Sequence, residues 1–333
     1  MFVFIIVATW FACGFILFSI YQYLIRKPVD LSKDLVLITG AAHGIGRLLA
    51  LLLSCYCQNI IVVDKNLEGL EETCHLVEKQ SGISLICYTC DLSDRNAIQN
   101  LANEIRIKHG RVTLLVSNAG IVNGNYLIDV PIEKVEQVIE VNLMAPFYLI
   151  KEFLPGMLGS AYREALGRIP ANLRIGPIEN ASRKCFPEAE PRGHLVFMSS
   201  IASQTIGTAV GDYCASKAGL SALVDSLRLE LEAMGMYDKI AVTDIRPYVI
   251  DTGMFEGFNS KLSILPILKP EYVAKQIVEA IRYRKRIVYI PWIIWLIPLL
   301  QRLLPFKFLV FLYKIGGAFD GMNTFTRANK KQD

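Results

Sequence analysis

The strongest constraint on the fold is a glycine-rich turn between two apolar segments near the start of the chain. Residues 35–38 are rich in β-branched side chains and predict a short buried strand, and residues 47–53 predict a helix. Between them, Gly40 permits a tight turn, Gly44 lets backbone N–H groups approach a ligand, and Gly46 lets the helix pack closely on the strand. The sequence therefore predicts a strand, a turn and a helix whose N-terminus can face an anion such as a pyrophosphate.

Further apolar runs repeat this alternation of strand and helix. The predicted strands are residues 59–63, 83–89, 114–116, 194–198 and 240–245. Strands that alternate with helical stretches predict an α/β fold with a doubly wound parallel sheet. The chain has 333 residues. About 260 remain when the apolar ends are set aside, which fits one domain over residues 29–290.

The second predicted strand ends at Asp64, 18 residues beyond Gly46. In a dinucleotide site, a carboxylate at this place accepts hydrogen bonds from the adenosine ribose hydroxyls and repels a 2′-phosphate. Asp64 therefore favours NAD over NADP as the cofactor. The positive charge of Lys65 and the partly cationic His43 soften that preference, so NADP stays open as the less favoured cofactor.

Tyr213 and Lys217 are four residues apart, which places a phenol and an ammonium on one face of a helix. Ser200 ends the preceding predicted strand. We expect the lysine cation, together with a positive nicotinamide ring, to lower the pKa of the phenol below its usual value of about 10. Tyr213 would then act as a base toward an alcohol whose oxygen Ser200 holds. The alternative is a chance Tyr–Lys pair on a surface helix.

Taken together, these motifs resemble the short-chain dehydrogenase/reductase superfamily over residues 33–290. Residues 39–46 match its T-G-x-x-x-G-x-G turn, and residues 118–120 match its N-A-G strand end. The resemblance implies a Rossmann-type fold with the catalytic residues Asn142, Ser200, Tyr213 and Lys217. Ser200 is preferred to Ser199 because it lies 13 residues before Tyr213, the usual separation in the family.

The resemblance also implies a cofactor site built from the glycine turn, the strand ends, the helix pair and the loop after the sixth strand. Its residues are Gly40, His43, Gly44, Ile45, Gly46, Asp64, Asp91, Leu92, Asn118, Ala119, Gly120, Tyr213, Lys217, Pro247, Ile250 and Thr252. Lys217 would hold the ribose, Asp91 would contact adenine, and Asn142 would position a water that relays the proton. Tyr248 stands where the family often has glycine, which is a departure in the closing loop.

Within the superfamily, the apolar ends and residues 252–257 resemble the branch of epidermal retinal dehydrogenases and lipid-droplet 17β-hydroxysteroid dehydrogenases. This implies an NAD-dependent enzyme for a lipophilic alcohol, with retinol as first choice and a hydroxysteroid as second, and a homodimer is compatible with it. Two other functions stay open. They are a scaffold at a lipid surface, which the intact catalytic set opposes, and a carbonyl reductase using NADPH, which Asp64 opposes.

Both ends of the chain predict contact with a membrane. Residues 1–25 are uncharged and long enough to cross a bilayer, so residues 1–28 predict an uncleaved anchor, either a single span or a hairpin. Basic residues follow the anchor, which places the catalytic domain on the cytosolic side of the endoplasmic reticulum or of a lipid droplet. Residues 291–333 predict a membrane-associated tail, and residues 287–300 an interfacial segment. The basic run 282–286 beside it is either a solvated helix end or a contact with anionic lipid.

Three further features bear on partners. The formal net charge is only +4, with basic and acidic residues interspersed, so nucleic acid is not an expected partner. The eight cysteines lie mostly in apolar runs without a histidine pair at ligand spacing, and we expect reduced thiols and no metal site. Residues 156–192 form an insertion that is either a tolerated surface loop or a segment that shields the site or binds a partner.

Overall fold

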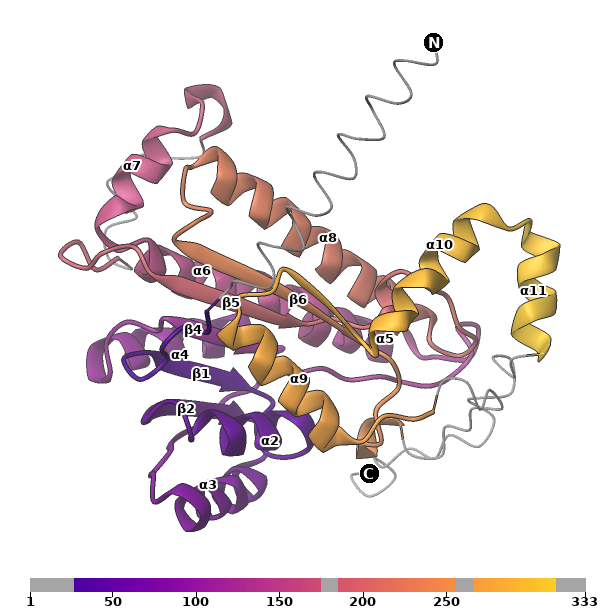
Figure 1. Ribbon diagram of the computed structural model, residues 1–333, viewed down its shortest axis with the longest axis horizontal. Helices are drawn as coiled ribbons and strands as arrows, with labels where there is room; N and C mark the ends of the chain where they lie inside the picture. The colour runs from indigo at the N-terminus through magenta and orange to yellow at the C-terminus, as the bar shows by residue number, and fades with distance from the viewer. Residues whose placement is uncertain (1–26, 175–184, 256–265, 316–333) are drawn as a thin grey trace.

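The computed structural model describes residues 27–174, 185–255 and 266–315. A seven-stranded parallel sheet runs through it in the order β3-β2-β1-β4-β5-β6-β7 (Figure 1). The strands are β1 (Leu35–Thr39), β2 (Asn59–Asp64), β3 (Ile86–Thr89), β4 (Leu114–Ser117), β5 (Gly193–Met198), β6 (Ile240–Pro247) and β7 (Ile287–Ile290). The Rossmann-like α/β fold predicted from the sequence is therefore confirmed.

Helices cover both faces of the sheet. One face packs against α2 (Gly44–Leu53), α3 (Leu67–Ser81) and α9 (Pro270–Arg282). The other packs against α4 (Arg95–Lys108), α6 (Ala145–Leu158) and α8 (Gly211–Ala233). The helix α5 (Ile132–Ile139) precedes α6 and contacts α8.

The two cores follow from the alternation of side chains along each strand. In β1, Val36 and Ile38 point into the core beneath α2 and α9, whereas Leu37 points into the core beneath α4 and α8. Because both faces are covered, the central strands β4 and β5 are buried at every position. Burial on both faces explains why these strands have continuous apolar runs and no alternation of polar and apolar residues.

The strand order places the loops that can form a site. The chain leaves β1 toward the β2 side of the sheet, and β4 begins the other half next to β1. A crevice forms at such a switch point, at the carboxyl ends of the parallel strands. The glycine turn follows β1 and residues 118–120 follow β4, so both lie at this edge.

The described part of the insertion 156–192 lies at the amino edge of the sheet, opposite the carboxyl edge. It continues from α6 into α7 (Tyr162–Gly167) and returns to β5, and the amide of Ser160 donates to the carbonyl of Ala189 at 2.8 Å. Ala165 is buried in the core beneath α6 and α8. Since α6 ends near the amino end of β5, the described part lies away from the carboxyl edge and does not shield the crevice there. Residues 175–184 lie outside the described residues.

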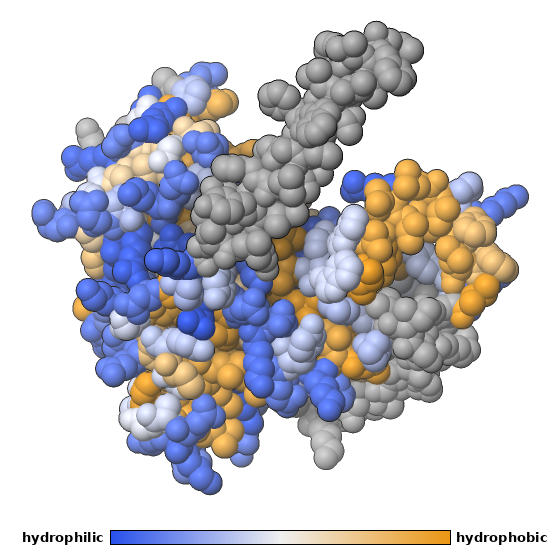
Figure 2. Space-filling model, in the orientation of Figure 1, coloured by the Kyte–Doolittle hydropathy of each residue, from blue (hydrophilic) through white to orange (hydrophobic). Residues whose placement is uncertain are grey.

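The start of the predicted interfacial segment belongs to the sheet. Residues 287–290 form β7, which pairs with β6, so their apolar character comes from packing in the sheet and the expectation of a lipid contact there is wrong. The chain then continues through the short turn Trp292–Trp295 into α10 (Leu296–Leu303) and α11 (Phe306–Ile315). These helices project from the body and present an apolar surface (Figures 1 and 2).

The basic run lies at the opposite end of β7 from these apolar helices. Two of its arginines stack on tyrosines of the same chain, Arg282 over Tyr56 at 4.4 Å and Arg286 over Tyr237 at 5.5 Å, measured to the ring centroids. The basic run is therefore close to the apolar helices in sequence, but β7 separates the two in space. Among the described residues, no helix has both the length and the apolar character needed to cross a bilayer. The predicted anchor lies almost entirely outside them, since the description begins at residue 27.

The expectation that all cysteines are reduced is wrong for one pair. Cys74 and Cys87 form a disulfide between α3 and the edge strand β3. The two residues meet because α3 covers the outer strand of the sheet. The sequence did not reveal this because each cysteine lies in a separate regular element. Among the other described cysteines, Cys57 and Cys90 are buried thiols, as expected.

Candidate active site

The glycine turn allows three backbone segments to approach closely at the carboxyl edge. Gly40 has a φ of +67°, and a Cβ there would lie 2.8 Å from the Cα of Ala119. A Cβ at Gly46 would overlap the carbonyl oxygen of Gly40. Asn118 fixes the contact, because its side-chain amide donates to the carbonyls of Thr39 at 2.9 Å and Gly40 at 3.1 Å. The turn after β1 and the end of β4 therefore form one rigid unit.

Gly44 differs from the other two glycines because the space beside it is open. It has a φ of +57°, and the nearest atom that a Cβ would meet is the Cγ2 of Thr252 at 3.8 Å. His43 is exposed at the N-cap of α2 and its side chain does not cap the helix. The first turn of α2 has no acidic residue. The N-terminus of α2 is thus suited to an anionic group, and Thr252 brings the closing loop against it.

The closing loop follows β6 and is tied to the body by the backbone. Ile250 pairs with Leu268 in an isolated parallel bridge, and the amide of Thr252 donates to the carbonyl of Ile250 at 2.8 Å. Tyr248, the departure from the family pattern, donates its amide to the carbonyl of Ile290 at 2.8 Å and packs partly buried against the core. The residue Pro247 ends β6 and is buried.

Asp64 is buried at the end of β2, beside the glycine turn. Its carboxylate accepts from the amides of Ala42 and Asn66, each at 3.1 Å. A carboxylate has about four lone-pair sites, so two bonds leave capacity for hydroxyl donors. Lys65, which follows it, is exposed.

Asp91 and Leu92 follow β3, next along the same edge. Leu92 is buried, and the carboxylate of Asp91 accepts from the hydroxyl and the amide of Ser93 at 2.7 and 2.9 Å. These hydrogen bonds hold the pKa of Asp91 below its usual range, and burial opposes them. The carboxylate is therefore fixed in direction and charged at neutral pH.

Tyr213 and Lys217 lie buried on the inner face of α8. The ammonium Nζ of Lys217 donates to the carbonyl of Met198 at 2.7 Å and lies 5.6 Å from the centroid of the Tyr213 ring. Phe255, from the loop after β6, meets that ring edge to face with centroids 5.9 Å apart. The structure therefore rejects the alternative of a chance pair on a surface helix.

The pKa of Tyr213 moves in the direction opposite to the expected one. Burial raises it to about 12, and a hydrogen bond with the side chain of Ser200 opposes this rise. The ammonium of Lys217 points to the Met198 carbonyl and does not offset the loss of hydration around the phenol. This contribution from Ser200 indicates that the two side chains lie close together.

Asn142 lies in a short π-helical turn, Glu140–Met144, between α5 and α6. Its side chain accepts from the amide of Ile121 at 2.8 Å and donates to the carbonyl of Ile121 at 2.9 Å and to the hydroxyl of Ser216 at 3.1 Å. A Cβ at Gly120 would lie 3.3 Å from both the Oδ1 of Asn142 and the Nζ of Lys217. Two of the predicted catalytic residues, Asn142 and Lys217, thus meet at Gly120. Turns of this π type often occur at functional sites.

A buried polar network behind Lys217 was not predicted from the sequence. The hydroxyl of Ser199 contacts that of Ser221 at 2.9 Å, and Ser221 donates to the fully buried Asp244 at 3.1 Å. Asp244 also pairs with Arg246 at 2.7 Å. The sequence feature that could have revealed this network is Asp244, a charged residue inside an apolar strand.

The network also reaches the turn that carries Ser200. Arg246 donates to the hydroxyl of Tyr289 on β7 at 2.9 Å, and that hydroxyl donates to the side chain of Gln204 at 2.7 Å. Gln204 closes the short turn Ile201–Ser203, which Ser200 begins. Both Ser200 and Lys217 are therefore supported from behind by the same hydrogen-bonded side chains.

Burial of Lys217 predicts a pH-dependent stability. Burial lowers the pKa of Lys217 to about 8, and the charge of Asp244 opposes this. Between pH 8 and 10.5 the folded chain loses this proton while the unfolded chain keeps it, so the free energy of unfolding rises with pH. Relative to Lys217→Met, the wild type should gain about 3 kcal/mol over this range in urea unfolding. The difference should be constant from pH 5 to 7, and a constant difference up to pH 10.5 would contradict the burial of a charged Lys217.

Comparison with known proteins agrees with this geometry. The family model for short chain dehydrogenases matches residues 34–169 and 173–263. Epidermal retinol dehydrogenase 2 from Homo sapiens is 32% identical over 313 residues, which cover 94% of this chain and 91% of that protein. Retinol dehydrogenase 10 from Homo sapiens is 31% identical, covering 93% of this chain and 90% of that protein.

Solved structures share the fold at lower sequence identity. A short-chain dehydrogenase/reductase from Burkholderia phymatum in complex with NAD has a TM-score of 0.65 and 21% identity, covering 82% of this chain and 94% of that one. A metagenomic short-chain oxidoreductase in complex with NADP has a TM-score of 0.58 and 23% identity, covering 78% and 97%. Cofactor preference therefore does not follow from the fold. The chain belongs to the short-chain dehydrogenase/reductase family of oxidoreductases, in the branch that includes the retinol dehydrogenases.

Proposed function

We propose that this chain interconverts a lipophilic alcohol and its carbonyl with NAD, with retinol as the preferred substrate and a hydroxysteroid as the second candidate. The observation that carries the proposal is the buried Tyr213, hydrogen-bonded to Ser200 and close to Lys217, at the carboxyl edge beside the glycine turn. A phenol in hydrogen-bond reach of a substrate oxygen is a suitable acid or base for this chemistry.

The residues at this edge fit a dinucleotide. Gly44 leaves open space at the N-terminus of α2, where a pyrophosphate would accept backbone N–H groups. Asp64 retains acceptor capacity for ribose hydroxyls, and its charge disfavours a 2′-phosphate. When bound, a nicotinamide cofactor would accept the hydride and add positive charge near the phenol. We assign the Asp91 carboxylate, fixed by Ser93, as the acceptor for the adenine amine.

The chain's own residues would then move the alcohol proton. Tyr213 takes the proton from the alcohol, and Ser200 orients the same oxygen. Lys217 would hold the ribose, and the positive nicotinamide ring would favour the ionised phenol. Asn142, fixed by Ile121 and Ser216, positions a water that carries the proton away. Phe255 packs on the phenol and presents an apolar wall to the substrate.

The names of the relatives and the apolar side chains next to Tyr213 support a lipophilic substrate. Two of the relatives named above are retinol dehydrogenases at about one third identity over nearly the whole chain. Phe255 contacts the base, and Met254 beside it is more than one third exposed. An alcohol with a long apolar body would bury this surface.

Substitution of Tyr213 tests the proposed base. Tyr213→Phe should lower the rate of all-trans-retinol oxidation with NAD by about 10²–10⁴-fold, because the phenol hydroxyl is removed while the ring contact with Phe255 is kept. The assay follows NADH formation by membranes that contain the full chain. Tyr272→Phe, on the exposed surface of α9, is the matched control and should retain full activity. Equal activity of Tyr213→Phe and the wild type would refute the assignment.

Substitution of Asp64 tests the cofactor preference. Asp64→Asn removes the charge that repels a 2′-phosphate, so the ratio of kcat/KM with NAD to that with NADP should fall at least about tenfold. The control is Glu68→Gln, an exposed carboxylate in the first turn of α3. A wild-type ratio that already favours NADP, or a ratio unchanged by Asp64→Asn, would contradict the NAD preference.

We also propose that α10 and α11 lie against a lipid surface, on the cytosolic face of the endoplasmic reticulum or a lipid droplet. Apolar side chains of these helices and of the turn before them are exposed (Figure 2). Phe306 and Phe311 of α11 are 71% and 53% exposed, and Trp292 of the turn is 70% exposed. Residues 287–315 contain no acidic residue, and their charged residues are all basic. Exposed aromatic residues with basic neighbours are typical of segments that lie in the membrane interface. A lipid surface here would deliver a lipophilic alcohol close to Phe255.

Tryptophan fluorescence tests this contact. The chain has three tryptophans, and in Trp10→Phe only Trp292 and Trp295 remain. We expect brominated phospholipid vesicles to quench this variant strongly, compared with vesicles of the same unbrominated lipid, because both indoles would lie in the interface. Equal fluorescence in the two kinds of vesicle would show that the tail does not contact lipid.

A further inference from the structure

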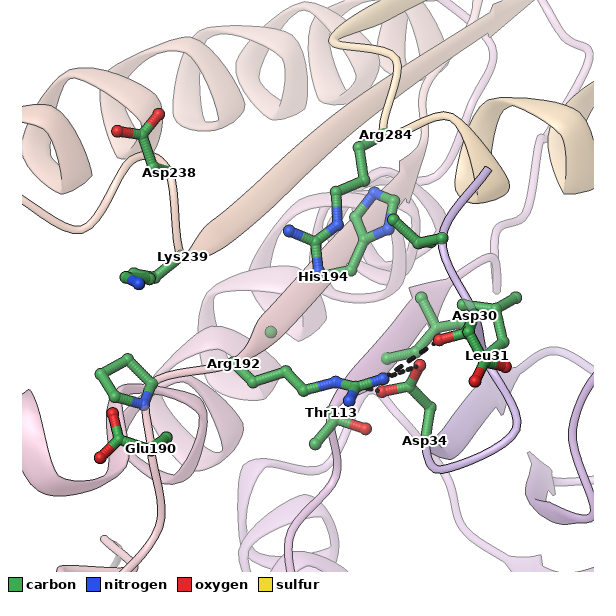
Figure 3. A pocket seen from close by; sticks show the side chains of 14 residues that line it. Asp30, Leu31, Asp34, Thr113, Glu190, Arg192, His194, Asp238, Lys239 and Arg284 are labelled. Carbon is green, nitrogen blue, oxygen red and sulfur yellow. Dashed lines mark hydrogen bonds and ion pairs between the residues drawn. The ribbon is translucent and has the colours of Figure 1, made fainter. Parts of the chain in front are cut away.

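A cavity lies at the opposite edge of the sheet from Tyr213 and has no part in the proposed function. Its volume is about 410 Å³, and it is lined by residues at the amino ends of the strands and by the segment that enters β1 (Figure 3). The side chains that matter are those of Asp34, Arg192, His194 and Arg284. Asp34 precedes β1, Arg192 and His194 lie at the start of β5, and Arg284 follows α9.

His194 presents an unsatisfied acceptor on the wall of this cavity. The hydroxyl of Thr243 donates its single proton to the carbonyl of Lys285 at 2.5 Å, so it must accept from the Nε2–H of His194 at 2.8 Å. Nδ1 is then the unprotonated nitrogen, and it is buried without a hydrogen-bond partner. The side chain is only 4% exposed, and burial together with Arg284 lowers its pKa to about 3, so the ring stays neutral. A ligand that donates a hydrogen bond would satisfy this nitrogen.

Arg284 presents an unsatisfied donor on the same wall. Its Nε is buried without a hydrogen-bond partner. Its backbone has a φ of +47°, a left-handed conformation that is uncommon for a residue with a long side chain. Backbone strain of this kind tends to occur at ligand sites and switches. The conformation directs the guanidinium to the cavity, beside His194 (Figure 3).

Among the buried and half-buried residues of the lining, two arginines, Arg192 and Arg284, stand against one carboxylate, Asp34. Arg111 lies outside the lining, and its pKa responds to the charges of Asp34 and Arg192. Arg192 pairs with Asp34 at 2.9 Å. The pKa values of Arg111 and Arg284 are lowered by burial and by the charge of Arg192, whereas Asp34 opposes this.

The other carboxylates do not neutralise this charge. Asp30 is exposed and accepts from the amide and the hydroxyl of Ser32, each at 2.9 Å. Glu190 and Asp238 are exposed at the rim, and Figure 3 shows them at the margin, away from Arg284. Lys239 is exposed at the rim as well, so it is not counted toward the charge of the cavity either.

We propose that this cavity binds a phosphate group that keeps one proton, with anionic oxygens at Arg284 and the P–OH donating to Nδ1 of His194. A phosphate that keeps one proton offers both kinds of atom at once. Sulfate and carboxylate are acceptors only at neutral pH, and a lone water would leave the positive charge uncompensated. The source is either free phosphate or the phosphomonoester headgroup of a lipid.

Thermal unfolding of the full chain in detergent at pH 6 tests the proposal. Near this pH about half of a phosphomonoester keeps its proton. Saturating inorganic phosphate should raise the Tm by about 2 °C or more, and sulfate at equal ionic strength should not. Arg284→Gly should raise the Tm in the absence of phosphate, because glycine accepts a positive φ, and should abolish the shift caused by phosphate. Arg286→Gln, whose side chain lies over Tyr237, is the control and should keep that shift.

Several outcomes would overturn the proposal. They are no shift with phosphate, an equal shift with sulfate, or a shift that persists in Arg284→Gly. A titration with short-chain phosphatidic acid identifies the source. Half-saturation at a concentration at least tenfold lower than with inorganic phosphate assigns a lipid headgroup, and equal concentrations assign free phosphate. Oxidation of retinol is measured separately at the other edge, so failure of this site leaves the proposed function untouched.

Discussion

The hydrogen bond from the Lys217 ammonium to the Met198 carbonyl fixes the geometry of the candidate active site. It joins α8 to the end of β5, inside the protein, where an unpaired ammonium would be strongly unfavourable. With α8 held in this way, Tyr213 lies one turn earlier against Ser200 and Phe255. The network through Asp244 supports the same junction from the other side.

The parallel sheet separates the molecule into two edges with different chemistry. At the carboxyl edge, glycines permit close approach of the backbone, and the ends of β1, β4 and β5 meet the loop after β6. The apolar helices α10 and α11 continue from the end of β7 at this edge. At the amino edge, arginines and His194 line a polar cavity. A lipid-facing reaction and a polar ligand site can therefore coexist in one small domain.

Local sequence patterns predicted the fold and the candidate site well, because each motif depends on neighbouring residues. The glycine turn depends only on the end of one strand, and the Tyr213–Lys217 spacing depends only on one helix. Features that depend on packing between distant segments were not accessible. The raised pKa of Tyr213 comes from burial by several elements, and the disulfide of Cys74 with Cys87 comes from the position of α3 over β3. Residues 287–290 looked like lipid-facing segments because buried strands and membrane segments are both apolar.

Transfer of deuterium from labelled retinol tests the central claim, that this edge carries out hydride transfer to a nicotinamide. Membranes containing the chain would be supplied with NAD and with all-trans-retinol that carries two deuteriums on the alcohol carbon, and the reduced cofactor would be analysed by mass spectrometry. We expect reduced NAD that is one mass unit heavier, together with retinal that retains one deuterium. Retinal formed without label in the cofactor, or no reduced cofactor with any retinoid or steroid alcohol, would contradict it.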